Sequence, residues 1–201
     1  MSEKSQVVER RIGNPWPWLH HVVGRYYLSP IICGSQAASL AGIPANELIA
    51  IPFLVPYTTT YDRICMNVSL ANAGGNVRVG IYNNTTSGAT PSSLVLDAGT
   101  YTTDVAEAKE IVISQQLARG WYWLAYVHDG NGAGGGWSGA DETGNLPWLG
   151  VTTTTGTNDT YSVWMAAFTY AALPATFTAG GALTLGSTYT AKIHLRVGSV
   201  P

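Results

Sequence analysis

The sequence predicts an all-β protein, an antiparallel jelly-roll-like β-sandwich preceded by an extended N-terminal arm. Three observations predict this class. Short runs of β-branched and aromatic residues recur along the chain, with glycine-, proline- and asparagine-rich turns between them. Helical periodicity is nearly absent, although residues 36–40 and 103–108 could each form one helical turn. Alternation of strands with long helical segments, the mark of a parallel α/β sheet, does not occur.

The first 25 residues are predicted to form the arm, and residues 26–201 to form the sandwich. Pro15 and Pro17 lie two residues apart, which excludes a helix interior and favours extended backbone. Exposure of Trp16 and Trp18 on such a segment would be costly. We therefore expect both tryptophans to bury against the body of this chain or against another subunit.

About nine strands are predicted in the body from these patterns. They cover residues 26–33, 47–55, 61–70, 77–82, 94–99, 109–114, 120–127, 161–168 and 189–197. Apolar and polar residues alternate well in the third and fourth of these runs, and an asparagine- and glycine-rich turn at residues 72–76 separates them. These two strands are therefore expected to pair as a β-hairpin.

The run at residues 120–127 is the most aromatic of the predicted strands. Because side chains of a strand alternate between its faces, one face receives Tyr122, Leu124 and Tyr126. The other face receives Trp121, Trp123, Ala125 and Val127. One set must be core, and the other is expected to be covered by another sheet edge, by a loop such as residues 129–147, or by a neighbouring subunit.

Composition excludes several classes of function. Charged residues are 11% of the chain, against about 25% in an ordinary domain, and the net charge is -2. A nearly neutral chain has no basis for broad nucleic-acid binding, and the high apolar content argues against disorder. No apolar run is long enough for a membrane-spanning helix, and no signal peptide is predicted, so we expect cytoplasmic synthesis. Cys33 and Cys65 are expected to be buried free thiols.

Residues for catalysis or metal binding are sparse, and no cofactor or metal site is predicted. The carboxylates Asp129, Asp141 and Glu142 fall in the glycine-rich loop, where solvated charges are the favoured interpretation over a glycosidase pair. The segment from Asp129 to Gly132 is similar to the start of a calcium loop, but its spacing to the later carboxylates does not match an EF-hand. A calcium site built by this loop stays open as an alternative.

Two tryptophans flank the acidic part of this loop. Trp137 and Trp148 could stack on a sugar, although large residues that fill or cover a sandwich core are the simpler interpretation. The candidate ligand-binding set is therefore Asp129, Trp137, Asp141 and Trp148.

Three segments carry a family resemblance: residues 77–83, residues 94–100, which contain a predicted Asp-Ala-Gly turn, and residues 111–125 with their aromatic end. In this order they resemble the β-rich modules of tailed-bacteriophage virion proteins. The resemblance implies a virion surface protein, assembled in the host cytoplasm as a homo-oligomer, with a trimer expected. Its arm would attach it to tail or capsid proteins, through Arg10, Arg11, Trp16 and Trp18.

An arm this short, without a fibre shaft, favours a tail appendage, a fibre tip or a capsid decoration protein that meets host-surface glycans. A stand-alone carbohydrate-binding module is the alternative function, and a glycan-degrading enzyme that uses Asp129, Asp141 or Glu142 is a third. The body holds six basic and ten acidic residues, because four of the ten basic and two of the twelve acidic residues lie in the arm. So neutral a body is prone to self-association, which favours an assembled protein.

Overall fold

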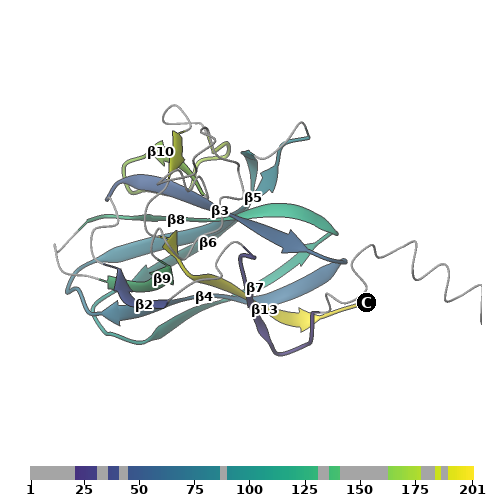
Figure 1. The fold of residues 1–201 in the computed structure, drawn as a ribbon, viewed down its shortest axis with the longest axis horizontal. Helices are drawn as coiled ribbons and strands as arrows, with labels where there is room; N and C mark the ends of the chain where they lie inside the picture. Colours follow the sequence, from purple (N-terminus) through teal and green to yellow (C-terminus); the bar gives the residue numbers. More distant parts are fainter. Residues whose placement is uncertain are drawn as a thin grey trace, which may run out of the picture.

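The computed structural model describes residues 21–30, 36–40, 45–86, 90–130, 136–140, 163–177, 184–186 and 190–201. These residues contain strands, turns and irregular segments but no helix (Figure 1). The strands are β1 (Tyr26–Leu28), β2 (Gln36–Leu40), β3 (Glu47–Val55), β4 (Thr59–Leu70), β5 (Asn76–Asn84), β6 (Pro91–Thr102), β7 (Ala108–Leu117), β8 (Gly120–His128), β9 (Gly136–Ala140), β10 (Val163–Ala167), β11 (Thr184–Gly186), β12 (Thr190–Ala191) and β13 (Ile193–Ser199). Within this described part, no helix is long and apolar enough to cross a membrane.

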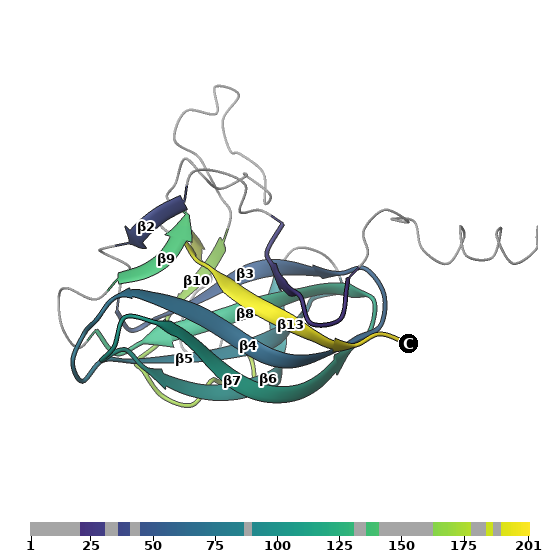
Figure 2. The same ribbon diagram turned by 90° about the horizontal axis from the view of Figure 1, so that it is seen from below.

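Eight of the strands form a jelly roll of two antiparallel sheets. The first sheet has the order β1-β13-β4-β7, and the second has the order β3-β8-β5-β6. Figures 1 and 2 show the two sheets as stacked layers. The chain changes sheet between β3 and β4, β4 and β5, β6 and β7, and β7 and β8, as in the double Greek key of a jelly roll. The predicted fold class is confirmed.

The segment between β8 and β13, together with β2, extends both sheets. Strands β9, β12 and β2 lengthen the first sheet, and β10 and β11 lengthen the second beyond β3. The pairing of β2 with β9 places Gln36 opposite Ala140 and Leu40 opposite Trp137. The helical turn predicted for residues 36–40 is therefore wrong, because a partner strand distant in sequence decides the local conformation. Residues 103–107 form bends instead of the second predicted helical turn, and β7 begins at Ala108.

The main core lies between the two sheets. Alternate residues of β13, Ile193, Leu195 and Val197, are buried there against alternate residues of the facing sheet such as Ile51 and Phe53. Each fully buried side chain of this size contributes roughly 1.5–3 kcal/mol. The alternation that predicted the strands is thus the alternation that fills the core.

Residues 72–76 do not close a β-hairpin, so this prediction is wrong. β4 pairs with β13 and β7, whereas β5 pairs with β8 and β6. The connection crosses between the sheets, and its backbone bonds go to the connection that follows β6: Asn72 N donates to Thr103 O (2.7 Å), and Thr103 N donates to Gly75 O (2.9 Å). The alternation of apolar and polar residues in β4 and β5 shows that each strand has one face in the core. It does not show that the two strands belong to opposite sheets.

The Asp97-Ala98-Gly99 segment is a bulge inside a strand and not a turn. β6 runs unbroken through it, and its register against β5 shifts between Val79 and Gly80. Gly99 adopts a φ of 105°, which a residue with a side chain rarely takes. The Asp97 carboxylate accepts a hydrogen bond from Arg78 Nε at 2.8 Å.

Both faces of β8 are buried. Leu124 and Tyr126 face the main core, while Trp123, Ala125 and Val127 face a second cluster on the outer side of the second sheet. A loop of the same chain, residues 168–177, covers this second cluster, and we call it the strap. The sequence left three possible covers for this face of β8: another sheet edge, a loop or a neighbouring subunit. In the described part of the chain the cover is a loop.

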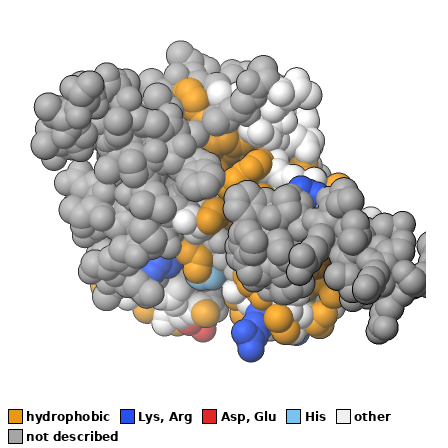
Figure 3. Space-filling view, turned by 45° about the vertical axis from the view of Figure 1, so that its right-hand side comes forward, with side chains coloured by type: hydrophobic (Ala, Val, Ile, Leu, Met, Phe, Trp, Pro, Cys, Tyr) orange, Lys and Arg blue, Asp and Glu red, His pale blue; other side chains and the backbone are white. Residues whose placement is uncertain are grey.

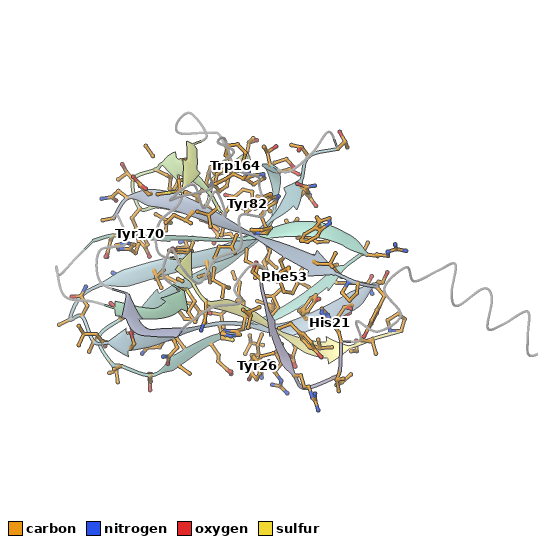
Figure 4. The ribbon with its side chains drawn as sticks, in the orientation of Figure 1. His21, Tyr26, Phe53, Tyr82, Trp164 and Tyr170 are labelled. Atoms are coloured by element: carbon orange, nitrogen blue, oxygen red, sulfur yellow. The ribbon has the colours of Figure 1, made fainter. Side chains whose placement is uncertain are left out.

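The strap lies across the second sheet and is bonded to it. Leu173 N donates to Asp97 Oδ2 at 3.0 Å, and the Tyr82 hydroxyl donates to Pro174 O at 2.8 Å. Phe177 meets Tyr82 edge to face, with ring centroids 5.4 Å apart. In Figure 4, Tyr82, Trp164 and Tyr170 lie on this side of the molecule.

Candidate binding groove on the open sheet

The outer face of the first sheet, which we call the open face, presents side chains of β1, β13, β4 and β7 and lacks a strap among the described residues. Large apolar side chains remain exposed on it: Tyr26 of β1 is 43% exposed and Val112 of β7 is 71% exposed. Figure 3, which does not look straight onto this face, shows that hydrophobic side chains also gather on a neighbouring part of the surface, with only a few charged side chains beside them. A surface of this character is typical of an interaction site.

Strand register aligns the open face in rows. One row runs across all four strands and contains Leu28, His194, Cys65 and Glu110. The adjacent row contains Tyr26, Arg196, Arg63 and Val112. Chemistry-bearing side chains from distant parts of the sequence are thus brought within one face of the sheet.

A groove of about 290 Å³ lies on this face. It is lined by Tyr26, Cys65, Met66, Asn67, Ala108, Glu110 and His194. The Tyr26 hydroxyl donates a 2.6 Å hydrogen bond to Glu110 Oε1, so the side chain of the edge strand β1 reaches across β13 and β4 to β7. This bond fixes the orientation of the Tyr26 ring at the groove.

Charges around the groove balance. Glu110 Oε2 lies 3.9 Å from Arg63 Nε, and Asp62 Oδ1 lies 3.8 Å from Arg196 Nε. Of these four residues Glu110 lines the groove, and Arg63 and Arg196 lie in the adjacent row of the sheet. Both contacts are long, partly exposed ion pairs, and each contributes little to stability.

Burial and neighbouring charges determine the protonation states in the groove. The hydrogen bond to Glu110, followed by burial, raises the pKa of Tyr26, so its hydroxyl keeps its proton. Burial, followed by the charge of Glu110, raises the pKa of Cys65 to about 12. Burial, followed by Lys192, lowers the pKa of His194. At neutral pH the groove presents a neutral imidazole and a protonated thiol, which suits hydrogen bonding and does not suit thiolate chemistry.

A second cluster surrounds His21, which is 6% exposed. Its ring stacks on Tyr27 at a centroid distance of 4.0 Å, and its Nδ1 lies 3.0 Å from the Tyr61 hydroxyl. The Tyr57 hydroxyl donates to the carbonyl oxygen of His21. Burial lowers the pKa of His21 to about 4, so the ring is neutral at neutral pH. These contacts attach the described end of the predicted arm to the body.

The structure describes two of the predicted ligand-binding residues, Asp129 and the backbone of Trp137. Asp129 directly follows β8, and both of its carboxylate oxygens accept hydrogen bonds from Asn76, at 3.1 Å from the backbone N and 2.8 Å from Nδ2. Asp129 therefore joins the end of β8 to the start of β5. The backbone of Trp137 lies in β9 opposite Val68, and its side chain is not described.

Several other predicted positions lie outside the described residues. They are Arg10, Arg11, Trp16, Trp18, Cys33, Asp141, Glu142 and Trp148. Cys65 is a buried free thiol, as expected.

Sequence reasoning missed the groove residues Tyr26, Glu110 and His194. The available signal was polar residues at alternate positions of otherwise apolar strands, such as His194 between Ile193 and Leu195. Their convergence depends on the pairing of four strands, which alternation does not reveal.

No three His, Cys, Asp or Glu side chains in the described ranges are arranged to hold a metal ion. No protein-family model matches the chain, and neither does any curated protein sequence.

Proposed function

We propose that the protein is a structural component of a bacteriophage virion, a tail fibre or appendage protein or a head decoration protein. It attaches through its N-terminal arm and exposes the β-sandwich for host-surface adhesion. The observation that carries this proposal is the jelly roll in which, among the described residues, a strap covers one sheet and none covers the other. Jelly rolls recur in viral capsid and lectin domains, where one face or edge serves assembly or binding.

The resemblance to virion modules supports the proposal at the level of strands. The resembling segments, residues 77–83, 94–100 and 111–125, fall on β5, β6, β7 and β8. These strands include three of the four in the second sheet and the edge strand of the first. These three segments therefore cover half of the eight-stranded framework.

The arm is proposed to attach the protein to the particle. The described chain enters the body at His21, which Tyr57 and Tyr61 hold in place. Arg10, Arg11, Trp16 and Trp18 precede this point and are the proposed contacts to tail or capsid proteins. We propose a homotrimer without catalytic activity, without nucleic-acid binding and without membrane insertion.

Removal of residues 1–20 tests the attachment. This truncation keeps the His21 cluster, so the body should retain its melting temperature while the protein disappears from purified particles. The measurement is immunoblotting of particles assembled with the truncated protein, beside a full-length control. The double variant Trp16→Ala, Trp18→Ala should show the same loss with a smaller change to the chain. Normal incorporation of the truncated protein would refute the arm as the anchor.

A stand-alone carbohydrate-binding module is the second candidate function, and the groove beside Tyr26 and Glu110 favours it. It predicts a monomer that binds glycans and has no place in a particle. Particle composition therefore separates the two candidates.

A further inference from the structure

We infer that the groove on the open face binds one ring of a neutral saccharide, with Tyr26 as the stacking surface and Glu110 and His194 as hydrogen-bonding partners. This inference rests on the proposed adhesive function and specifies its ligand class and site. It places sugar binding on β1, β13, β4 and β7 instead of on the loop after β8.

The size and lining of the groove suit a small, partly apolar ligand. Its volume of about 290 Å³ is at the lower end of the range for small-molecule sites. Cys65 and Met66 are buried beneath it, and the small side chain of Ala108 leaves room at the β7 side. A single sugar ring fits such a site, whereas a polypeptide segment would need a longer channel.

Tyr26 supplies an exposed aromatic ring that is already oriented. The residue is 43% exposed, while its hydroxyl donates a 2.6 Å hydrogen bond to Glu110. A pyranose has an apolar face of C–H groups, which packs on the electron-rich face of an aromatic ring. Because the hydrogen bond holds the ring before any ligand arrives, less conformational entropy is lost on binding.

Glu110 and His194 supply polar groups that can form hydrogen bonds with sugar hydroxyls. Glu110 uses Oε1 for Tyr26, while Oε2 lies 3.9 Å from Arg63, which is beyond hydrogen-bonding distance. This carboxylate can therefore accept further hydrogen bonds. A neutral His194 ring has one donor and one acceptor nitrogen. Sugar hydroxyls both donate and accept, so they satisfy the two kinds of group together.

Charge selects a neutral sugar. Asp62 and Glu110 are balanced by Arg63 and Arg196, and Lys192, whose charge acts on His194, adds one positive charge, so the face carries little net charge to attract an ion. An anionic sugar would meet the Glu110 carboxylate inside the groove and be repelled. An amino sugar would have to compete with Arg63 for the same carboxylate.

Saturation-transfer NMR on the full-length protein tests the inference. The probes are the methyl glycosides of a neutral hexose, a 6-deoxyhexose and an N-acetylhexosamine, with a hexuronic acid and a hexosamine as charged comparisons. We expect saturation transfer to at least one neutral glycoside, with a dissociation constant on the order of 1 mM. Tyr26→Ala should abolish the transfer, and Glu110→Gln should weaken binding on the order of tenfold.

Matched controls separate binding from folding. Glu107→Gln alters an exposed carboxylate next to β7 but outside the groove, and Tyr170→Ala alters a tyrosine of the strap, which lies over the second sheet. Both variants should bind like the wild type. Absence of transfer from every neutral glycoside to the folded protein would overturn the inference, as would preferred binding of a charged sugar or full binding by Tyr26→Ala. Particle incorporation does not depend on the groove, so a failure here leaves the arm experiment to decide the proposed function.

Discussion

At the residue scale, His21 shows how one side chain joins a terminal segment to the body. Its ring is enclosed by Tyr27, Tyr57 and Tyr61, and burial among them favours the neutral imidazole. The sequence showed two histidines after a Pro-Trp segment, which is no signal for burial. The tyrosines that enclose the ring come from β1, from the turn after β3 and from β4, so only the fold brings them together.

The His21 ring predicts a pH dependence of stability. Its pKa falls from 6.5 to about 4 on folding, so between these values the unfolded chain binds a proton that the folded chain excludes. Stability is therefore full above pH 6.5 and falls as the pH drops toward 4, by up to roughly 3 kcal/mol from this residue. Melting temperatures measured across this range should fall less steeply for His21→Asn than for the wild type. Parallel curves for the two proteins would contradict the assignment.

At the element scale, the strap explains why β8 is aromatic on both faces. Trp123 and Leu124 point in opposite directions, and each is buried in its own cluster. The sequence predicted that both faces of this strand need a cover. It did not identify residues 168–177, because the loop lacks periodicity and its bonds to Asp97 and Tyr82 join segments far apart in the chain.

Gly80 of β5 provides the test of the strap. A Cβ added at this position would lie 2.3 Å from Leu173 Cδ1 and 2.4 Å from the Leu96 carbonyl oxygen. Because the second of these is backbone, Gly80→Ala must shift β5 relative to β6 as well as move the Leu173 side chain of the strap, at a cost of roughly 1–3 kcal/mol. Thermal unfolding should show a melting temperature lowered by several degrees, and proteolysis should reach the strap sooner.

Gly24→Ala is the matched control for Gly80→Ala. Gly24 has a φ of 81° and no atom within 4 Å of an added Cβ, so this variant carries backbone strain but no steric clash. It should cost about 1 kcal/mol and leave proteolysis of the strap unchanged. If both variants lose the same free energy of unfolding, close packing under the strap is not the reason for glycine at position 80.

Which strands pair with one another could not be predicted from the sequence. Alternation at Ile64, Met66 and Val68 correctly indicated a half-buried strand, and the neighbouring turn suggested a hairpin. The structure instead places β4 and β5 in opposite sheets. Patterns of burial define which face points inward, whereas pairing depends on hydrogen bonds between residues as distant as Cys65 and His194.

At the scale of the whole molecule, the all-β class and the sandwich could be predicted from the sequence. Many short, weakly charged strands must bury their apolar faces, and without helices a second sheet is the cover that remains. The groove could not be predicted, because Tyr26, Glu110 and His194 come from three strands that the jelly roll brings together. Asp129 shows a contact of the same kind: Asn76 donates a hydrogen bond to each of its carboxylate oxygens, and the sequence does not indicate that these two residues meet.

Low charge and an open face predict self-association. With 11% charged residues and with Val112 71% exposed on β7, an isolated body would leave apolar surface in water. We expect the purified protein to have three times the chain mass of 21.3 kDa in light scattering coupled to size-exclusion chromatography. Val112→Glu should lower this mass, while Val105→Glu tests an exposed valine outside the strands. A wild-type monomer at every concentration would contradict the proposed trimer.

The short strand β1 also determines how the molecule responds to a mechanical pull. β1 contributes only three residue pairs to the first sheet, Tyr26 with Arg196, Tyr27 with Leu195 and Leu28 with His194. A force applied ahead of His21 reaches the aromatic cluster before it reaches these pairs. Through Tyr57 and Tyr61 the load passes into the connection after β3 and into the long central strand β4. Tyr57 and Tyr61, rather than the three residue pairs of β1, are then the first point of resistance to such a force.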